Sequence, residues 1–149
     1  MLKVKDIMTK EVVTVKLETT VMEIAGIFAN KNIRALPVLD ESGDLIGIVT
    51  ETDLVEQDKN LHIPTVISIF DWVIYLESDK KFEKELKKMT GRVVGDIYST
   101  DVVTVSPDTP IADVADLLSS KKINSLPVVE GKKLVGIISR IDLIRSMAG

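Results

Sequence analysis

The stretch NIRALPVLDESGDLIGIVTETDL occupies residues 32–54, and a related stretch, INSLPVVEGKKLVGIISRIDL, occupies residues 123–143. Each contains a Leu-Pro-Val step, a polar turn with a glycine, and a Gly-Ile run that ends in Thr or Ser three residues before an aspartate. Two short β-branched runs joined by such a turn are typical of a β-hairpin. The chain therefore carries two copies of one hairpin, each followed by a helix start.

The similarity extends upstream of both hairpins, so the chain contains an internal repeat. Residues 4–39 align without a gap with residues 94–129, and the run Val12–Val15 matches Val102–Val105. Self-similarity of this kind indicates two copies of one supersecondary unit. The sequence is therefore divided into a first repeat at residues 1–60, an insertion without a counterpart at 61–92, and a second repeat at 93–149.

Each copy is predicted to form a strand, a helix, two strands and a helix. The run Val12–Val15 favours the first strand, and apolar residues recur at helical spacing over residues 21–28 and 111–118. Thr20 and Glu23 fit a capping box at the start of the first helix. A unit this small has one sheet face to bury, so we expect an α/β (α+β) fold of tandem βαββα repeats. The repeats would pack through their sheets about a pseudo-two-fold axis and leave two related clefts between them.

The insertion at residues 61–92 is predicted to be mostly helical. Residues 66–76 are apolar and include three aromatic residues, and residues 79–90 are charged with apolar residues on one helical face. The simpler interpretation is a helical segment packed on the module or on a partner subunit. The alternative is a lid or specificity element over one of the clefts.

Composition and charge exclude several classes of function. The 149 residues (16.4 kDa) are 45% hydrophobic and carry a net charge of −4, which is typical of a soluble protein and disfavours a nucleic-acid binder. There is no cysteine and one histidine, His62, which excludes thiolate sites and disfavours histidine triads. The chain has no signal-peptide block, P-loop or nucleophile elbow. We expect a cytoplasmic, non-enzymatic protein with no catalytic residue, metal ligand or membrane partner.

The ordered motifs resemble those of the CBS domain, named after cystathionine β-synthase. They are Asp-hydrophobic-Met-Thr, Val-Thr-Val, Leu-Pro-Val and Gly-hydrophobic-hydrophobic-Thr/Ser-x-x-Asp, and the set recurs in both repeats. The resemblance implies a tandem pair, the Bateman module, which binds AMP, ADP, ATP or S-adenosylmethionine and often forms disc-like dimers. It further implies a homodimer that transmits its ligand state to a partner protein. No cofactor would be obligatory, although Mg²⁺ could accompany ATP.

The pairs Thr50–Asp53 and Ser139–Asp142 have two interpretations. Both fit the [ST]-x-x-[DE] capping box, in which the hydroxyl and the carboxylate satisfy free backbone N–H groups at a helix start. By the resemblance, the carboxylate instead accepts the hydroxyl groups of a ribose, and the helix start lies near phosphate. The two roles can coexist.

By the resemblance, each cleft draws residues from both copies. The first site is expected to use Arg34, Ala35, Thr50 and Asp53, with Tyr98, Val103 and Ile123 across the cleft. The second is expected to use Asn124, Ser125, Ser139 and Asp142, with Met8, Val13 and Ile33 across the cleft. The apolar members of both sets also fit ordinary core positions.

The two expected sites differ in charge. The family often places basic residues just before the Leu-Pro step, where they meet phosphate; Arg34 fits this pattern and Asn124 does not. The first cleft is therefore expected to bind phosphorylated ligands more tightly, with Arg140 and Lys121 as the residues that could compensate in the second. The alternative function is a structural or dimerisation protein with degenerate, ligand-free clefts.

Overall fold

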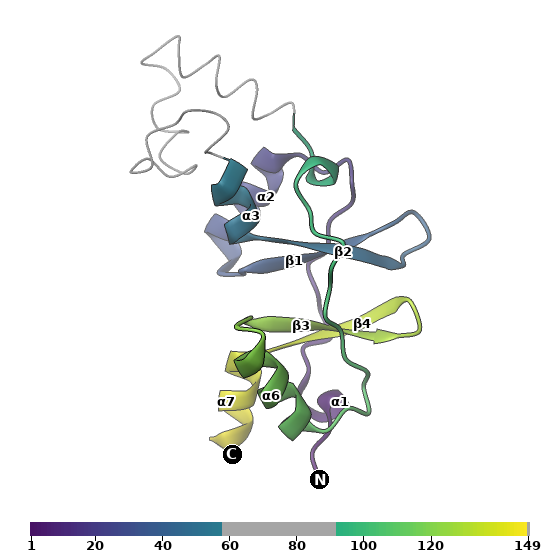
Figure 1. The fold of residues 1–149 in the computed structure, drawn as a ribbon, viewed down its shortest axis with the longest axis vertical. Helices are drawn as coiled ribbons and strands as arrows, with labels where there is room; N and C mark the ends of the chain where they lie inside the picture. The colour runs from purple at the N-terminus through teal and green to yellow at the C-terminus, as the bar shows by residue number, and fades with distance from the viewer. Residues whose placement is uncertain (58–91, 149) are drawn as a thin grey trace.

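The computed structural model describes residues 1–57 and 92–148, which fold as two similar α+β units (Figure 1). The first unit consists of α2 (Val21–Lys31), β1 (Ala35–Leu39), β2 (Leu45–Thr50) and α3 (Glu51–Gln57). The second consists of α6 (Ile111–Ser120), β3 (Ser125–Glu130), β4 (Lys133–Ser139) and α7 (Arg140–Met147). A short helix α1 (Val4–Ile7) and a 3₁₀ turn η2 (Val94–Asp96) precede them along the chain. The predicted insertion at 61–92 lies outside the described residues, apart from Arg92.

The two hairpins face each other, and the helices cover their outer sides (Figure 1). In each antiparallel hairpin the first strand begins opposite the end of the second, with Ala35 paired to Thr50 and Ser125 to Ser139. The register shifts at the same place in both copies, after Val38 and after Val128. The predicted fold class, two α+β repeats packed through their sheets, is confirmed.

The first predicted strand, Val12–Val15, is wrong in extent. Only Val15 pairs, in a parallel bridge to β1: its N–H donates to the carbonyl of Pro37 (3.0 Å), and its carbonyl accepts from Leu39 N–H (2.9 Å). The equivalent Val105 forms the same bridge with β3. Pairing stops after Val15 because the N–H of the next residue donates to the Thr19 hydroxyl in a turn (3.0 Å).

The turn after each long helix contains a residue with a positive φ. The residues after α2 and α6 include Asn32 (φ 52°) and Lys122 (φ 53°), which occupy equivalent positions in the repeat. At the other end of α2 the predicted cap is present, since the Thr20 hydroxyl accepts from Glu23 N–H (3.1 Å). Asparagine tolerates the left-handed region because its short polar side chain can bond locally, whereas lysine has no such compensation.

The two units exchange their leading segments. Val94, from the start of the second sequence repeat, is buried in the first core, and Val4 is buried in the second. The exchange continues downstream, where Ser99 pairs with Ile48 in β2, and Thr9 pairs with β4. Each packed unit therefore combines the body of one sequence repeat with the leading segment of the other.

Candidate functional site: a cleft between the two units

A cleft of about 280 Å³ lies between the hairpins, close to the lower end of the range for small-molecule sites, about 300 Å³. The first unit lines it with Arg34, Ala35, Ile48, Thr50, Glu51 and Thr52. The second unit lines it with Asp101, Val102, Val103, Lys122, Ile123, Asn124, Ser125 and Pro127. Because both units contribute, a molecule bound here contacts both repeats at once.

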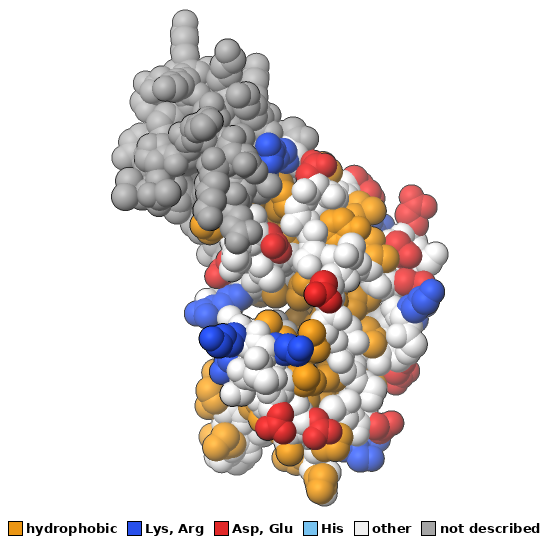
Figure 2. Space-filling view, viewed as in Figure 1, with side chains coloured by type: hydrophobic (Ala, Val, Ile, Leu, Met, Phe, Trp, Pro, Cys, Tyr) orange, Lys and Arg blue, Asp and Glu red, His pale blue; other side chains and the backbone are white. Residues whose placement is uncertain are grey.

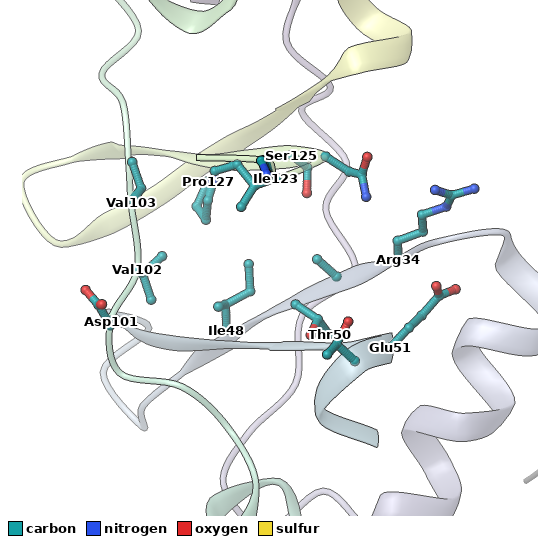
Figure 3. A pocket seen from close by; sticks show the side chains of 14 residues that line it. Arg34, Ile48, Thr50, Glu51, Asp101, Val102, Val103, Ile123, Ser125 and Pro127 are labelled. Carbon is teal, nitrogen blue, oxygen red and sulfur yellow. The ribbon is translucent and has the colours of Figure 1, made fainter. Parts of the chain in front are cut away.

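The lining is apolar in the middle and charged at its ends (Figure 3). Ile48 rises from β2 toward Ile123 and Pro127 of the opposite unit, while Arg34 and Asp101 lie at opposite ends. The hairpin explains this placement, because alternate residues of a strand share one face, which puts Ile48 and Thr50 together. The arrangement suits a ligand with a flat apolar part and a polar or charged part.

Thr50 and Asp53 form the predicted capping box beside the cleft. Asp53 Oδ2 accepts from the backbone N–H (2.8 Å) and the hydroxyl (3.2 Å) of Thr50, and Asp53 N–H faces the Thr50 hydroxyl oxygen (3.3 Å). The Asp53 side chain is half-buried, and within residues 1–57 and 92–148 no hydrogen bond engages its Oδ1. The cap thus uses one carboxylate oxygen and leaves the other available to accept.

The equivalent pair in the second unit is closed. Asp142 is only 6% exposed, and its Oδ2 accepts from Ser139 N–H (2.9 Å) and the Ser139 hydroxyl (3.1 Å). Its Oδ1 accepts from the Thr9 hydroxyl (3.3 Å) in the exchanged N-terminal segment, and Arg145 lies 4.0 Å from it. Both oxygens of Asp142 are therefore occupied by the protein itself.

The structure brings together only part of the residues expected for the first site. Arg34, Ala35, Thr50, Val103 and Ile123 line the cleft, and Asp53 lies directly behind Thr50 through the cap. Tyr98 is not among the lining residues. It packs on the first core, with its ring against the backbone of Gly47.

The residues expected for the second site are not all brought together in the described cleft. Asn124 and Ser125 line the cleft just described, together with the first-site residues. Val13 and Ile33 pack against the first core, and Met8 packs against the second, with its sulfur beside Gly136. Ser139 and Asp142 form the closed cap. Asn124 and Ser125 thus share a cleft with Arg34 instead of lying in a separate one.

Several lining residues were not expected from the sequence; they are Ile48, Glu51, Thr52, Asp101, Val102, Lys122 and Pro127. A signal existed for Ile48, which shares a strand face with Thr50. The signal for Lys122 is its place in the repeat, because it stands where the first copy has Asn32. Without the packed units, however, that position could not be assigned to a cleft.

The two cations that line the described cleft have neutral equivalents in the repeat. Arg34 and Lys122 both line the described cleft, and the residues equivalent to them in the repeat are Asn124 and Asn32. Lys and Arg side chains gather beside the hollow between the units (Figure 2). Arg140 is engaged elsewhere, since its guanidinium donates to the carbonyls of Ile123 (3.1 Å) and Leu118 (2.9 Å) at the end of α6.

The described ranges also bear on metal sites and membrane spans. Within residues 1–57 and 92–148, no three His, Cys, Asp or Glu side chains are placed to hold a metal ion. His62 lies outside these ranges. None of the helices in the same part of the chain has the length and apolar character needed to cross a bilayer.

Comparison with known proteins places the same motifs in one family. The sequence model of the CBS domain matches residues 4–60 and 94–149. Protein MJ1426 of Methanocaldococcus jannaschii is 30% identical over 152 residues, which covers 97% of this chain and 90% of that protein. Other relatives are longer, and the chain spans 57% of the chloroplastic protein CBSX2 of Arabidopsis thaliana.

Two similar solved structures contain adenosine-based ligands. CBSX2 in complex with AMP is 29% identical with a TM-score of 0.75, over 99% of this chain and 97% of that one. The CBS domain pair of protein MJ0100, in complex with 5′-methylthioadenosine and S-adenosyl-L-methionine, is 28% identical with a TM-score of 0.71. That similarity covers 100% of this chain and 98% of the other.

Proposed function

The chain belongs to the CBS domain family, and on this basis we propose that it is a regulatory module that binds an adenosine-containing ligand in the cleft beside Asp53. The observation that carries the proposal is that cleft, which is apolar in the middle, is lined by Thr50 with the Asp53 carboxylate bonded behind it, and has Arg34 at one end. The ribose hydroxyls would meet Asp53, the base would lie against Ile48 and Val103, and a phosphate would meet Arg34.

The ligand would act by holding the two units in one arrangement. A ligand shifts a conformational equilibrium only through different affinities for its states. A molecule in this cleft contacts the end of β2 and the residues that follow α6, so its affinity depends on how the units are placed. A separate effector protein would read that arrangement. We further propose that the chain catalyses no reaction and that it is located in the cytoplasm.

The closed Asp142 pair supports a single preferred site. A nucleoside at that pair would have to displace the Thr9 hydroxyl from a carboxylate that is 6% exposed. A hydrogen bond to a charged group contributes about 1.5–3 kcal/mol, so this displacement would weaken binding. The Asp53 cleft requires no such exchange. It is also the cleft that carries Arg34.

A thermal shift separates this proposal from a purely structural role. An adenine nucleotide at 100 times its dissociation constant should stabilise the fold by about 2.7 kcal/mol. For a chain of this size we therefore expect the melting temperature to rise by about 5–11 °C. The measurement is a melting curve with AMP, ADP, ATP and S-adenosylmethionine, each with and without Mg²⁺. Guanine and pyrimidine nucleotides serve as controls and should give smaller shifts.

The opposite result has a definite meaning. If none of these ligands raises the melting temperature, the clefts do not bind adenosine compounds. The structural or dimerisation function then becomes the better account of the chain.

We propose that the chain forms a homodimer, and one helix surface supports this. On α7, Ile141, Ile144 and Met147 are 50%, 58% and 84% exposed and recur every three residues along one side of the helix. Exposed apolar stripes of this kind mark interaction surfaces. Sedimentation equilibrium at micromolar concentration should give about twice the 16.4 kDa chain mass. Ile144→Glu should shift the population toward monomer, and a wild-type protein that stays monomeric would contradict the proposal.

A further inference from the structure

We propose that Lys122 is a specificity-determining residue that makes the Asp53 cleft selective for phosphorylated nucleosides over uncharged or sulfonium-bearing adenosine ligands. The inference rests on the proposed function, because it chooses among the adenosine-containing ligands of that site. Three observations support it: the backbone conformation of this lysine, the state of its ammonium group and the charges around it.

The backbone at Lys122 is unfavourable for a lysine. Its φ of 53° lies in the left-handed region, where a side chain with a Cβ costs about 1–2 kcal/mol and where glycine or asparagine is usual. The equivalent position in the first repeat has the usual residue, Asn32, at φ 52°. The fold therefore accepts asparagine at this turn, and the lysine in the second repeat is not required for the backbone conformation.

The ammonium group of Lys122 is available to a ligand. Over the two described ranges it takes part in no hydrogen bond or ion pair. Other lysines are engaged: Lys133 pairs with Asp44 at 2.8 Å and contacts the Ser42 carbonyl, and Lys5 pairs with Asp108 at 3.2 Å. Lys122 is exposed and lines the cleft, so a bound anion can reach it without breaking an existing contact.

The other charges that line the cleft explain why the Lys122 ammonium group would affect the binding of an anion. Glu51 lies at the same end as Arg34 (Figure 3), and its carboxylate opposes the approach of a phosphate. Asp101 adds a second carboxylate at the other end, so that the lining would carry a net charge of −1 without Lys122. Lys122, from the opposite unit, brings the lining to two cations and two carboxylates, and its charge opposes the sulfonium of an S-adenosylmethionine-type ligand.

The two cations come from different units, so a ligand that binds both of them couples the two units. Arg34 precedes β1 of the first unit, and Lys122 follows α6 of the second. An anion held by both ties the two units together, which a neutral adenosine cannot do in this way. A phosphorylated ligand should therefore also be the one that changes the arrangement of the units most.

The test compares Lys122→Asn with wild type by calorimetric titration of AMP, adenosine and S-adenosylmethionine. We expect the AMP dissociation constant to rise about fivefold, the effect of about 1 kcal/mol for a partly exposed charge pair. Adenosine should change less than about twofold, and S-adenosylmethionine should bind equally well or more tightly. Since asparagine suits this φ, the melting temperature of the unliganded variant should rise by about 2 °C, which shows that it is folded.

The matched control is Lys121→Asn, which removes the same charge from an exposed neighbour that does not line the cleft. An equal loss of AMP affinity in both variants would overturn the role of Lys122 and point to general attraction. Unchanged AMP binding in Lys122→Asn would also overturn it, while wild-type binding of AMP would leave the proposed function standing. If wild type binds none of the three ligands, the proposed function fails and this inference fails with it.

Discussion

Asp53→Ala is expected to weaken AMP or ATP binding by about 10- to 100-fold, whereas Asp142→Ala is expected to leave the affinity within about threefold. A hydrogen bond to a charged group contributes about 1.5–3 kcal/mol, and each 1.4 kcal/mol is a factor of ten. Asp53 lies behind the lining residue Thr50, and under the proposed function its Oδ1 makes such a bond to a ribose hydroxyl. Both oxygens of Asp142 are already occupied by Ser139 and Thr9. Calorimetric titration measures the two affinities.

Stability should follow the opposite order in these two variants. Each loses a capping carboxylate, which costs about 1 kcal/mol. Asp142→Ala also removes a buried acceptor from the Thr9 hydroxyl and should therefore lower the melting temperature more than Asp53→Ala does. Asp53→Ala is expected to lose more affinity and Asp142→Ala more stability, so a general folding defect cannot account for both results. If Asp142→Ala were the variant that lost affinity, the choice of cleft would be wrong.

Most of the fold could be predicted from the sequence because its signals are local. The Leu-Pro-Val step, the glycine turn and the following Gly-Ile run specify both hairpins, and Thr20 specifies the start of α2. The predicted first strand is longer than the observed one. A β-branched run indicates a preference for extended backbone but does not show whether a neighbouring strand is there to pair with it. Only Val15 lies where the edge of β1 can pair with it.

The candidate site was harder to predict because it depends on which segments pack together. Thr9 and Ser99 are equivalent hydroxyl residues in the repeat. The Thr9 hydroxyl donates to the side-chain carboxylate of Asp142 (3.3 Å), whereas the Ser99 hydroxyl accepts from the backbone N–H of Asp101 (3.3 Å). The sequence does not predict this difference. The same holds for Lys122, whose place in the cleft follows from the way two units with different turn residues face each other.

The exchange of leading segments leads to the prediction with the largest effect on stability, Gly47→Ala. The segment that contains Tyr98 and Ser99 crosses directly over Gly47, held by two backbone bonds of 2.9 Å between Ser99 and Ile48. A Cβ on Gly47 would lie 2.4 Å from a ring carbon of Tyr98 and 2.5 Å from the Ser99 carbonyl oxygen. The ring can turn aside, but the carbonyl cannot move without breaking the bridge. We expect a loss of about 3 kcal/mol and a fall in melting temperature of about 6–12 °C.

Gly136→Ala is the matched control in the second unit. There a Cβ would meet the Met8 sulfur at 2.7 Å and the Thr9 carbonyl oxygen at 3.0 Å. The methionine side chain is flexible and can move, and the backbone oxygen is half an ångström farther away than at Gly47. We therefore expect about 1 kcal/mol of destabilisation from the smaller overlap.

Equal losses in the two glycine variants, measured by chemical unfolding, would show that the crossing segment does not hold the first unit more tightly than the second. Rescue of Gly47→Ala by Tyr98→Ala would assign the clash to the ring, whereas we expect no rescue because the Ser99 backbone remains in place.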